Sequence, residues 1–257
     1  MASLSAVLLR APLVVLSLAV IAFGCGLGDA DEEARIDVFT THHAAPLPSG
    51  EIPTYGAPTA ARTWVNDMGW EVNLTEGYIV VRGLRLVECD DTKHEVPFAY
   101  GPFPDYLNAQ DLDVVPMGGV DTPVGTYCSV IVNYGPYRFA DTQGTPKGPY
   151  PLPTDRDLEG TTIFLAGIAR LGDQTVPFEF RSSEDRIVEL EIREADGVPT
   201  EYRVEAGVGA LKVTLGKTYD PFFNGIDFSA FDPMMINAGL MDHLVMQSRA
   251  YRGTTIY

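Results

Sequence analysis

Short segments of alternating apolar and polar residues recur along the chain, and clusters of glycine and proline separate them. Trp70, Val72 and Leu74 alternate with polar residues, and residues 186–193 repeat this pattern. Such alternation is typical of half-buried strands, because successive side chains of a strand point to opposite faces. Since 25 Gly and 19 Pro are available for turns, the sequence predicts a mainly β fold.

About eight short strands are expected, and their spacing by turns favours a β-sandwich. Gly83 interrupts the longest β-rich run and predicts a bulge or kink, while Gly172 and Asp173 predict a hairpin turn. Strand–helix–strand alternation is missing, so a nucleotide-binding α/β fold is not expected. Further predicted strands lie at 36–41, 78–89, 128–134, 161–169, 175–180, 201–205 and 211–215.

The C-terminal segment alone has a helical pattern. Asp232 followed by Pro233 is the arrangement of a helix N-cap with proline at the first helical position. Apolar residues then recur at spacings of three and four, namely Ile236, Leu240 and Leu244. We therefore predict a helix over residues 233–250, with Gly253 ending it.

Residues 1–24 have the features of an export signal. Arg10 carries their only positive charge, and an apolar run of about 14 residues follows, too short for a permanent membrane helix but suited to a signal peptide. Two small residues, Ala22 and Gly24, then precede Cys25, with Phe23 between them. This resembles the bacterial lipoprotein box, whose cysteine is acylated and becomes the mature N-terminus.

The lipoprotein resemblance implies a lipid anchor on Cys25 and three parts of the chain. Residues 1–24 are the lipoprotein signal peptide, residues 25–35 an acidic tether, and residues 36–257 a single β-sandwich domain. Gly26 follows the cysteine in place of aspartate, which by the same resemblance implies the outer membrane. Ordinary cleavage after Gly24 or Ala30, and a retained membrane helix, are the alternatives.

The three cysteines fit an exported protein. If Cys25 is acylated, Cys89 and Cys128 remain, and in an oxidising compartment two remaining cysteines most simply form a disulfide. Cys89 closes one predicted strand and Cys128 opens another, so both lie where strands can be neighbours. Closing a loop of about 40 residues stabilises a protein by roughly 3–4 kcal/mol. Two buried free thiols are the alternative.

Charge and motifs restrict the function. The net charge of −17 disfavours nucleic acid, because an acidic surface repels phosphates. The chain contains no Gly-x-Ser-x-Gly, no phosphate-binding glycine loop and no His-Glu-x-x-His. We expect a protein that is not an enzyme and needs no cofactor. Its expected partners are the membrane, through the lipid anchor, and a protein of the envelope.

His42 and His43 are the candidate metal ligands. They follow the first predicted strand directly, and on an extended chain they belong to opposite faces, so one of them at most joins a given site. The alternative is a pair of exposed loop histidines. Thioether and imidazole ligands suited to copper also occur in the predicted helix, where packing on the sheet is the alternative. They are Met241, His243 and Met246, near Met234 and Met235.

Four stretches resemble acidic envelope lipoproteins of myxobacteria-like Gram-negatives, a group that carries no established activity. They are Trp70–Thr75 continuing into Tyr78–Cys89, Gly125–Cys128, Leu165–Ala169 followed by Val176–Phe178, and Phe223–Phe228. This resemblance implies an envelope location and a sandwich-like fold. It implies no reaction.

The layout is also similar to the methanobactin-partner family of periplasmic copper-binding proteins, which are exported β-rich proteins with a Gly-x-Tyr strand entry. This resemblance implies copper as an alternative ligand, and the residues to test are His42, His43, Trp64 and Trp70. The main expectation is a non-catalytic outer-membrane lipoprotein that binds a ligand or a protein. The alternative is a periplasmic copper-binding protein.

Overall fold

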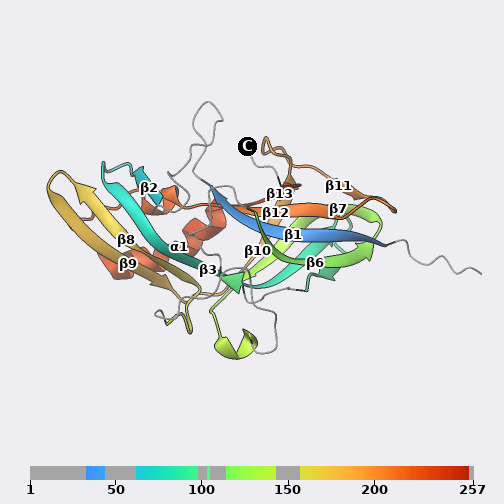
Figure 1. Cartoon of the computed structure of the whole chain (residues 1–257), viewed down its shortest axis with the longest axis horizontal. Helices are drawn as coiled ribbons and strands as arrows, with labels where there is room; N and C mark the ends of the chain where they lie inside the picture. The colour runs from blue at the N-terminus through green and yellow to red at the C-terminus, as the bar shows by residue number, and fades with distance from the viewer. Residues whose placement is uncertain (1–32, 44–61, 98–102, 105–113, 143–156, 255–257) are drawn as a thin grey trace, which may run out of the picture. The chain divides into compact units, whose positions relative to one another are not determined.

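Strand β3 (Glu71–Glu88) connects two groups of strands in the computed structural model of the chain (Figure 1). Its first half pairs antiparallel with β8 (Ile163–Leu171), and its second half pairs antiparallel with β7 (Gly125–Tyr134). The strands follow one another in the order β6-β1-β12-β13-β10-β7-β3-β8-β9. The sheet curls around its own core, so the predicted mainly β, sandwich-like fold is confirmed.

The structure describes residues 33–43, 62–97, 103–104, 114–142 and 157–254, which all belong to one compact unit. The remaining strands are β1 (Glu33–His43), β2 (Arg62–Val65), β4 (Lys93–Glu95), β5 (Phe103–Pro104), β6 (Val115–Pro123), β9 (Gln174–Ser182), β10 (Arg186–Arg193), β11 (Tyr202–Val204), β12 (Leu211–Thr218) and β13 (Ser248–Arg252). The helical elements are η1 (Phe139–Thr142), η2 (Asp220–Phe223) and α1 (Pro233–Gln247). Within these residues, no helix has both the length and the apolar character needed to cross a membrane.

The predicted number of about eight strands is wrong, because the described residues contain a sheet of thirteen. Strands β2, β4, β5 and β11 have two to four residues each, which is too short for an alternation pattern. Each of them pairs with β3 or β7. Tertiary pairing therefore creates these strands.

Strand β1 begins earlier and ends later than the predicted strand 36–41. It starts at Glu33, so residues 33–35 belong to the sheet and not to a tether. It also contains both histidines of the candidate metal pair. β1 pairs in parallel with β12 and antiparallel with β6, and these two neighbours determine its full length.

Helix α1 begins as predicted and ends earlier. The Asp232 side chain accepts a hydrogen bond of 2.9 Å from the Met234 amide, which confirms the N-cap. The helix ends at Gln247, and residues 248–252 form β13 between β12 and β10. The predicted helical end at 250 is therefore wrong: Ser248 and Ala250 are buried in the sheet.

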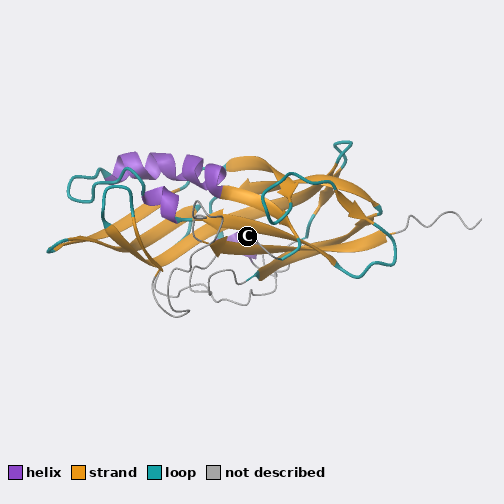
Figure 2. Ribbon diagram, turned by 90° about the horizontal axis from the view of Figure 1, so that it is seen from above, coloured by secondary structure: helices purple, strands orange, loops and turns teal. Residues whose placement is uncertain are grey.

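Helix α1 covers one face of the sheet (Figure 2). Leu240, Met241 and Leu244 are its buried residues, and they join the same apolar core as the inward residues of the strands. Aromatic side chains of β9 and of the segment 219–231 fill the space beside them: Phe178, Phe180, Phe222, Phe223, Phe228 and Phe231. Apolar burial is the main favourable term of folding, and these rings contribute to it.

Candidate functional site

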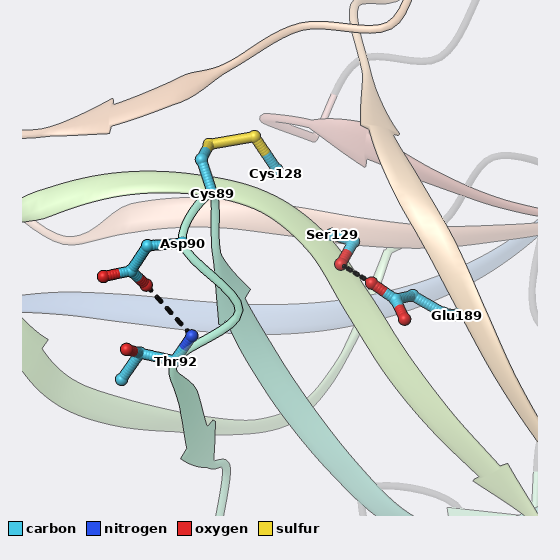
Figure 3. The surroundings of a disulfide bond; sticks show 6 residues. All are labelled: Cys89, Asp90, Thr92, Cys128, Ser129 and Glu189. Atoms are coloured by element: carbon cyan, nitrogen blue, oxygen red, sulfur yellow. Dashed lines mark hydrogen bonds between the residues drawn. A yellow bond between two sulfur atoms is a disulfide. The ribbon is translucent and has the colours of Figure 1, made fainter.

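The predicted disulfide between Cys89 and Cys128 is confirmed (Figure 3). Their Cα atoms are 5.0 Å apart, which is within the range of unstrained disulfides. The Cys89 amide also donates to Thr126 O at 2.9 Å. The disulfide therefore joins Cys89, which directly follows β3, to Cys128 inside β7.

Polar groups around the disulfide are paired locally. Thr92 donates its amide to Asp90 at 3.0 Å, and this hydrogen bond is the main reason why the pKa of Asp90 is lowered. Glu88 and His94 are 2.6 Å apart, and Ser129 donates to Glu189 (Figure 3). The first two pairs lie at the turn between β3 and β4, and the third links the neighbouring strands β7 and β10.

Cys25 lies outside the described residues. The candidate metal ligands His42 and His43 lie within β1, so the expectation that they follow the first strand is wrong, and so is the alternative that places them in a loop. His42 is buried, with 1% of its surface exposed. His43 is in register with Thr218, and its side chain lies outside what the structure describes. Successive strand positions belong to opposite faces, so the two histidine positions belong to different faces of the sheet.

His42 belongs to a row of buried polar residues that crosses three strands. It is in register with Lys217 of β12, and Lys217 is in register with Ser248 of β13. Residues in register on neighbouring strands share a face. The Lys217 amine donates to Thr40 Oγ1 at 2.5 Å. We call Thr40, His42, Lys217 and Ser248 the buried polar row.

The buried polar row is enclosed by protein. Each of its four members is 1% exposed or less. Ser248 Oγ lies 2.9 Å from the Tyr134 hydroxyl and donates to Leu244 O at 2.8 Å. The ring of Tyr219 covers His42, with 5.9 Å between the ring centroids. The row therefore joins β1, β12, β13 and β7 internally and offers no direct access to a solvent-borne ligand.

A metal cation is disfavoured at His42 by its neighbours. Lysine carries positive charge and donates hydrogen bonds without accepting any, so Lys217 opposes a cation at the adjacent position. The described residues contain no group of three or more His, Cys, Asp or Glu side chains arranged to hold a metal ion. Within the part of the sheet that the structure describes, the His42 ring packs against Tyr219.

The methionines of the C-terminal segment are dispersed. Met241 is buried in the core, Met246 is 54% exposed, and Met234 and Met235 are exposed near the helix start. The His243 ring packs against Phe222 at 5.9 Å. The interpretation of this segment as a helix packing on the sheet holds for Met241, whereas the exposed methionines make no contribution to the core.

The two tryptophans pack in the aromatic core. The Trp70 ring lies 5.6 Å from the ring of Phe228, and the Trp64 ring lies 5.2 Å from that of Phe223. Trp70 is 1% exposed. Both rings therefore connect the β2–β3 hairpin with the segment that follows β12.

An open pocket of about 320 Å³ lies on the outer face of β1 and β6, which are side by side in Figure 1. Arg35, Asp37 and Phe39 of β1 alternate with buried core residues and line it. Arg35 Nε donates to Asp37 Oδ1 at 2.9 Å. The other lining residues are Pro97, Pro116, Gly118 and Gly119.

Glycine at position 119 leaves room for the Arg35–Asp37 ion pair. Gly119 is in register with Asp37, and a Cβ there would overlap the Asp37 carboxylate and lie 2.6 Å from Arg35 Nη2. Any other residue would displace the pair. We call the open pocket lined by these residues and by Phe39, Pro97, Pro116 and Gly118 the β1–β6 pocket.

Sequence reasoning missed both Lys217 and the β1–β6 pocket. The alternation of Arg35, Asp37 and Phe39 with apolar residues was available as a signal, and so was the Gly118-Gly119 pair. Neither indicates that the two segments are adjacent, because 82 residues separate them (119 − 37 = 82).

Comparisons with known proteins give one weak similarity. No protein-family model matches the sequence, and no curated protein matches it. Among solved structures, MbnP from Methylosinus trichosporium is 11% identical in sequence, with a TM-score of 0.36. The match covers 78% of this chain and 79% of that chain.

Proposed function

We propose that this chain is an exported protein tethered to the outer membrane by lipid on Cys25, with a non-catalytic binding module as its body. The observation that carries the proposal is the Cys89–Cys128 disulfide. Structural disulfides persist in oxidising compartments such as the periplasm. The bond uses two of the three cysteines and leaves Cys25, which follows the apolar leader.

The surface chemistry favours binding over catalysis. Nucleophilic and acid–base catalysis need a reactive group and a base that meet in an accessible pocket. In the β1–β6 pocket, the titratable side chains Arg35 and Asp37 pair with each other. The lysine and histidine of the buried polar row are enclosed. An open pocket without a paired nucleophile and base suits recognition of a ligand or of an envelope partner.

The lipid anchor predicts that Cys25→Ser releases the protein from membranes. Each buried methylene of a fatty chain contributes about 0.8 kcal/mol, so the loss of the chains should remove nearly all membrane attachment. After export in a Gram-negative host, cell fractionation should place the variant in the soluble periplasm and the unchanged chain in the outer membrane.

Metabolic labelling with an alkyne fatty acid separates acylation from other membrane attachment. The double variant Cys89→Ala/Cys128→Ala retains Cys25 and should be labelled like the unchanged chain, whereas Cys25→Ser should carry no label. Membrane attachment that persists in Cys25→Ser would refute the lipid anchor. A labelled chain confined to the inner membrane would refute the outer-membrane location.

Copper is the alternative ligand expected from the sequence, and the neighbours of His42 argue against it. We predict that the protein purified from copper-supplemented cells retains well under one copper ion per chain, measured by inductively coupled plasma mass spectrometry. Because Lys217 opposes a cation beside His42, His42→Ala should leave this content unchanged. Stoichiometric copper that is lost on His42→Ala or His43→Ala would establish the copper-binding alternative instead.

A further inference from the structure

The β1–β6 pocket has walls of two chemical kinds. One is polar and consists of the Arg35 guanidinium and the Asp37 carboxylate. The other is apolar and consists of three rings, those of Phe39, Pro97 and Pro116. Pockets that recognise small molecules commonly combine apolar rings with a few fixed polar groups.

The polar wall presents a donor beside an acceptor. Arginine has five N–H donors, and a carboxylate has two acceptor oxygens. Because Arg35 Nε and Asp37 Oδ1 bond to each other, the two groups lie side by side, and both keep hydrogen-bonding capacity. Each hydroxyl of a ligand donates one hydrogen bond and accepts others. Two neighbouring hydroxyls therefore match this pair, one accepting from Arg35 and one donating to Asp37.

The charges around the pocket cancel. Arg35 lies 3.6 Å from Asp121 in addition to its bond with Asp37. Lys212 is in register with Asp37 and lies 5.8 Å from the centroid of the Phe39 ring. Two charged side chains of the lining, Arg35 and Asp37, thus have one anionic and one cationic neighbour, Asp121 and Lys212. A neutral ligand fits this balance better than a phosphate or a polyamine, because balanced charges give a charged ligand no net attraction to offset its desolvation.

The apolar wall and the volume restrict the ligand to about one ring. Aromatic and proline rings offer flat apolar surfaces to the C–H face of a ligand ring. A volume of about 320 Å³ lies at the lower limit of ligand pockets, which range from roughly 300 to 1,000 Å³. A pyranose combines the two features that these walls require, because it carries neighbouring hydroxyls on the edge of its ring and has an apolar C–H face.

We propose that the β1–β6 pocket binds one pyranose unit of a neutral saccharide. Our inference about where that saccharide comes from rests on the proposed function. Arg35 follows Cys25 by ten residues (35 − 25 = 10), a stretch of chain that spans at most roughly 35 Å. Lipid on Cys25 would therefore hold the pocket near the membrane surface, within reach of envelope glycans.

The test is a titration of the full chain, purified in a detergent without a sugar headgroup. The probes are N-acetylglucosamine, galactose and mannose, and the readout is isothermal titration calorimetry. At least one probe should bind with a dissociation constant of about 1 mM. Absence of binding by all three at 20 mM would overturn the proposal.

Gly119→Ala is the variant that isolates the pocket. Its Cβ meets the ends of the Arg35 and Asp37 side chains, so the ion pair moves. The same Cβ lies 3.0 Å from Ile36 O, so β1 has to shift by a few tenths of an ångström. Affinity should fall at least about tenfold, because hydrogen bonds to both charged groups are weakened. Gly209→Ala is the matched control, since a Cβ there meets nothing within 4 Å, and its affinity should be unchanged. Equal affinities in the two variants would place saccharide binding elsewhere and overturn the assignment.

Two further binding assays identify the source of the saccharide. Purified peptidoglycan should retain the protein in a sedimentation assay if the source is the cell wall, and vesicles containing a neutral glycolipid should retain it if the source is the membrane. Either retention supports the proposal provided that Gly119→Ala reduces it. These measurements do not depend on acylation, so a failed pocket and a failed lipid anchor give different results.

Discussion

Replacing Asn66 with alanine is expected to lower the free energy of unfolding by about 4 kcal/mol. Asn66 is buried between β2 and β3 and uses all its amide groups. Its Oδ1 accepts from the amides of Met68 and Trp70 at 3.1 and 2.8 Å. Its Nδ2 donates to the carbonyls of Phe223 and Ile226, both at 2.9 Å. Each buried partner left without a hydrogen bond costs about 1–3 kcal/mol.

Urea unfolding followed by circular dichroism measures this loss. Asn73→Ala is the matched control, since Asn73 lies in a half-buried position and donates one hydrogen bond, of 3.1 Å, to Thr63. Its cost should stay below about 1 kcal/mol. Asn66→Asp retains both acceptor contacts and loses the two donors, so its loss should be large as well. A cost for Asn66→Ala no greater than that of Asn73→Ala would contradict this assignment.

The position of Asn66 explains why a single side chain has so large an expected effect. Its two donors hold the segment 219–228 against the β2–β3 hairpin, and Asp67 adds a hydrogen bond from the Gly225 amide. That segment contributes Phe222, Phe223 and Phe228 to the core. Loss of Asn66 therefore weakens the contact between two segments about 160 residues apart in the sequence.

Local patterns in the sequence predict strands well and strand ends poorly. The segments 70–75 and 78–89 are predicted as separate strands, whereas both belong to β3. The break between them is a shift of register between Leu74 and Glu76. A bulge and a strand end look alike in an alternation pattern, because both interrupt the period of two. At Gly83 the predicted bulge is confirmed.

The places where prediction fails depend on distant pairing. Thr40 and Leu215 are 175 residues apart and meet in the β1–β12 pair. No local pattern shows that Lys217, near the end of a strand, lies beside His42 in the interior. The role of Gly119 in the Gly118-Gly119 pair, which is to leave room for the Arg35–Asp37 ion pair, likewise becomes visible only when β6 lies beside β1. The sequence therefore indicates the kind of element at these positions, and the pairing of strands indicates the role of the residues.

The second large effect is expected from Cys89→Ala/Cys128→Ala, which should lower the free energy of unfolding by about 3–4 kcal/mol. The two cysteines are 39 positions apart. Cross-linking them restricts the unfolded chain, and the cost of closing a loop of this length gives this magnitude. Denaturant unfolding of oxidised protein should show the loss as a lower midpoint.

A reductant distinguishes the cross-link from the packing of the cysteines. Treatment of the unchanged chain with a reductant should lower the midpoint about as much as the double variant does, and the double variant should not respond to it. Cys25→Ser, which retains the disulfide, should respond like the unchanged chain. Intact masses with and without reductant should differ by two hydrogens. If the reductant left both mass and midpoint unchanged, strand pairing alone would hold Cys89 beside Cys128, and the main support for an oxidising compartment would be lost.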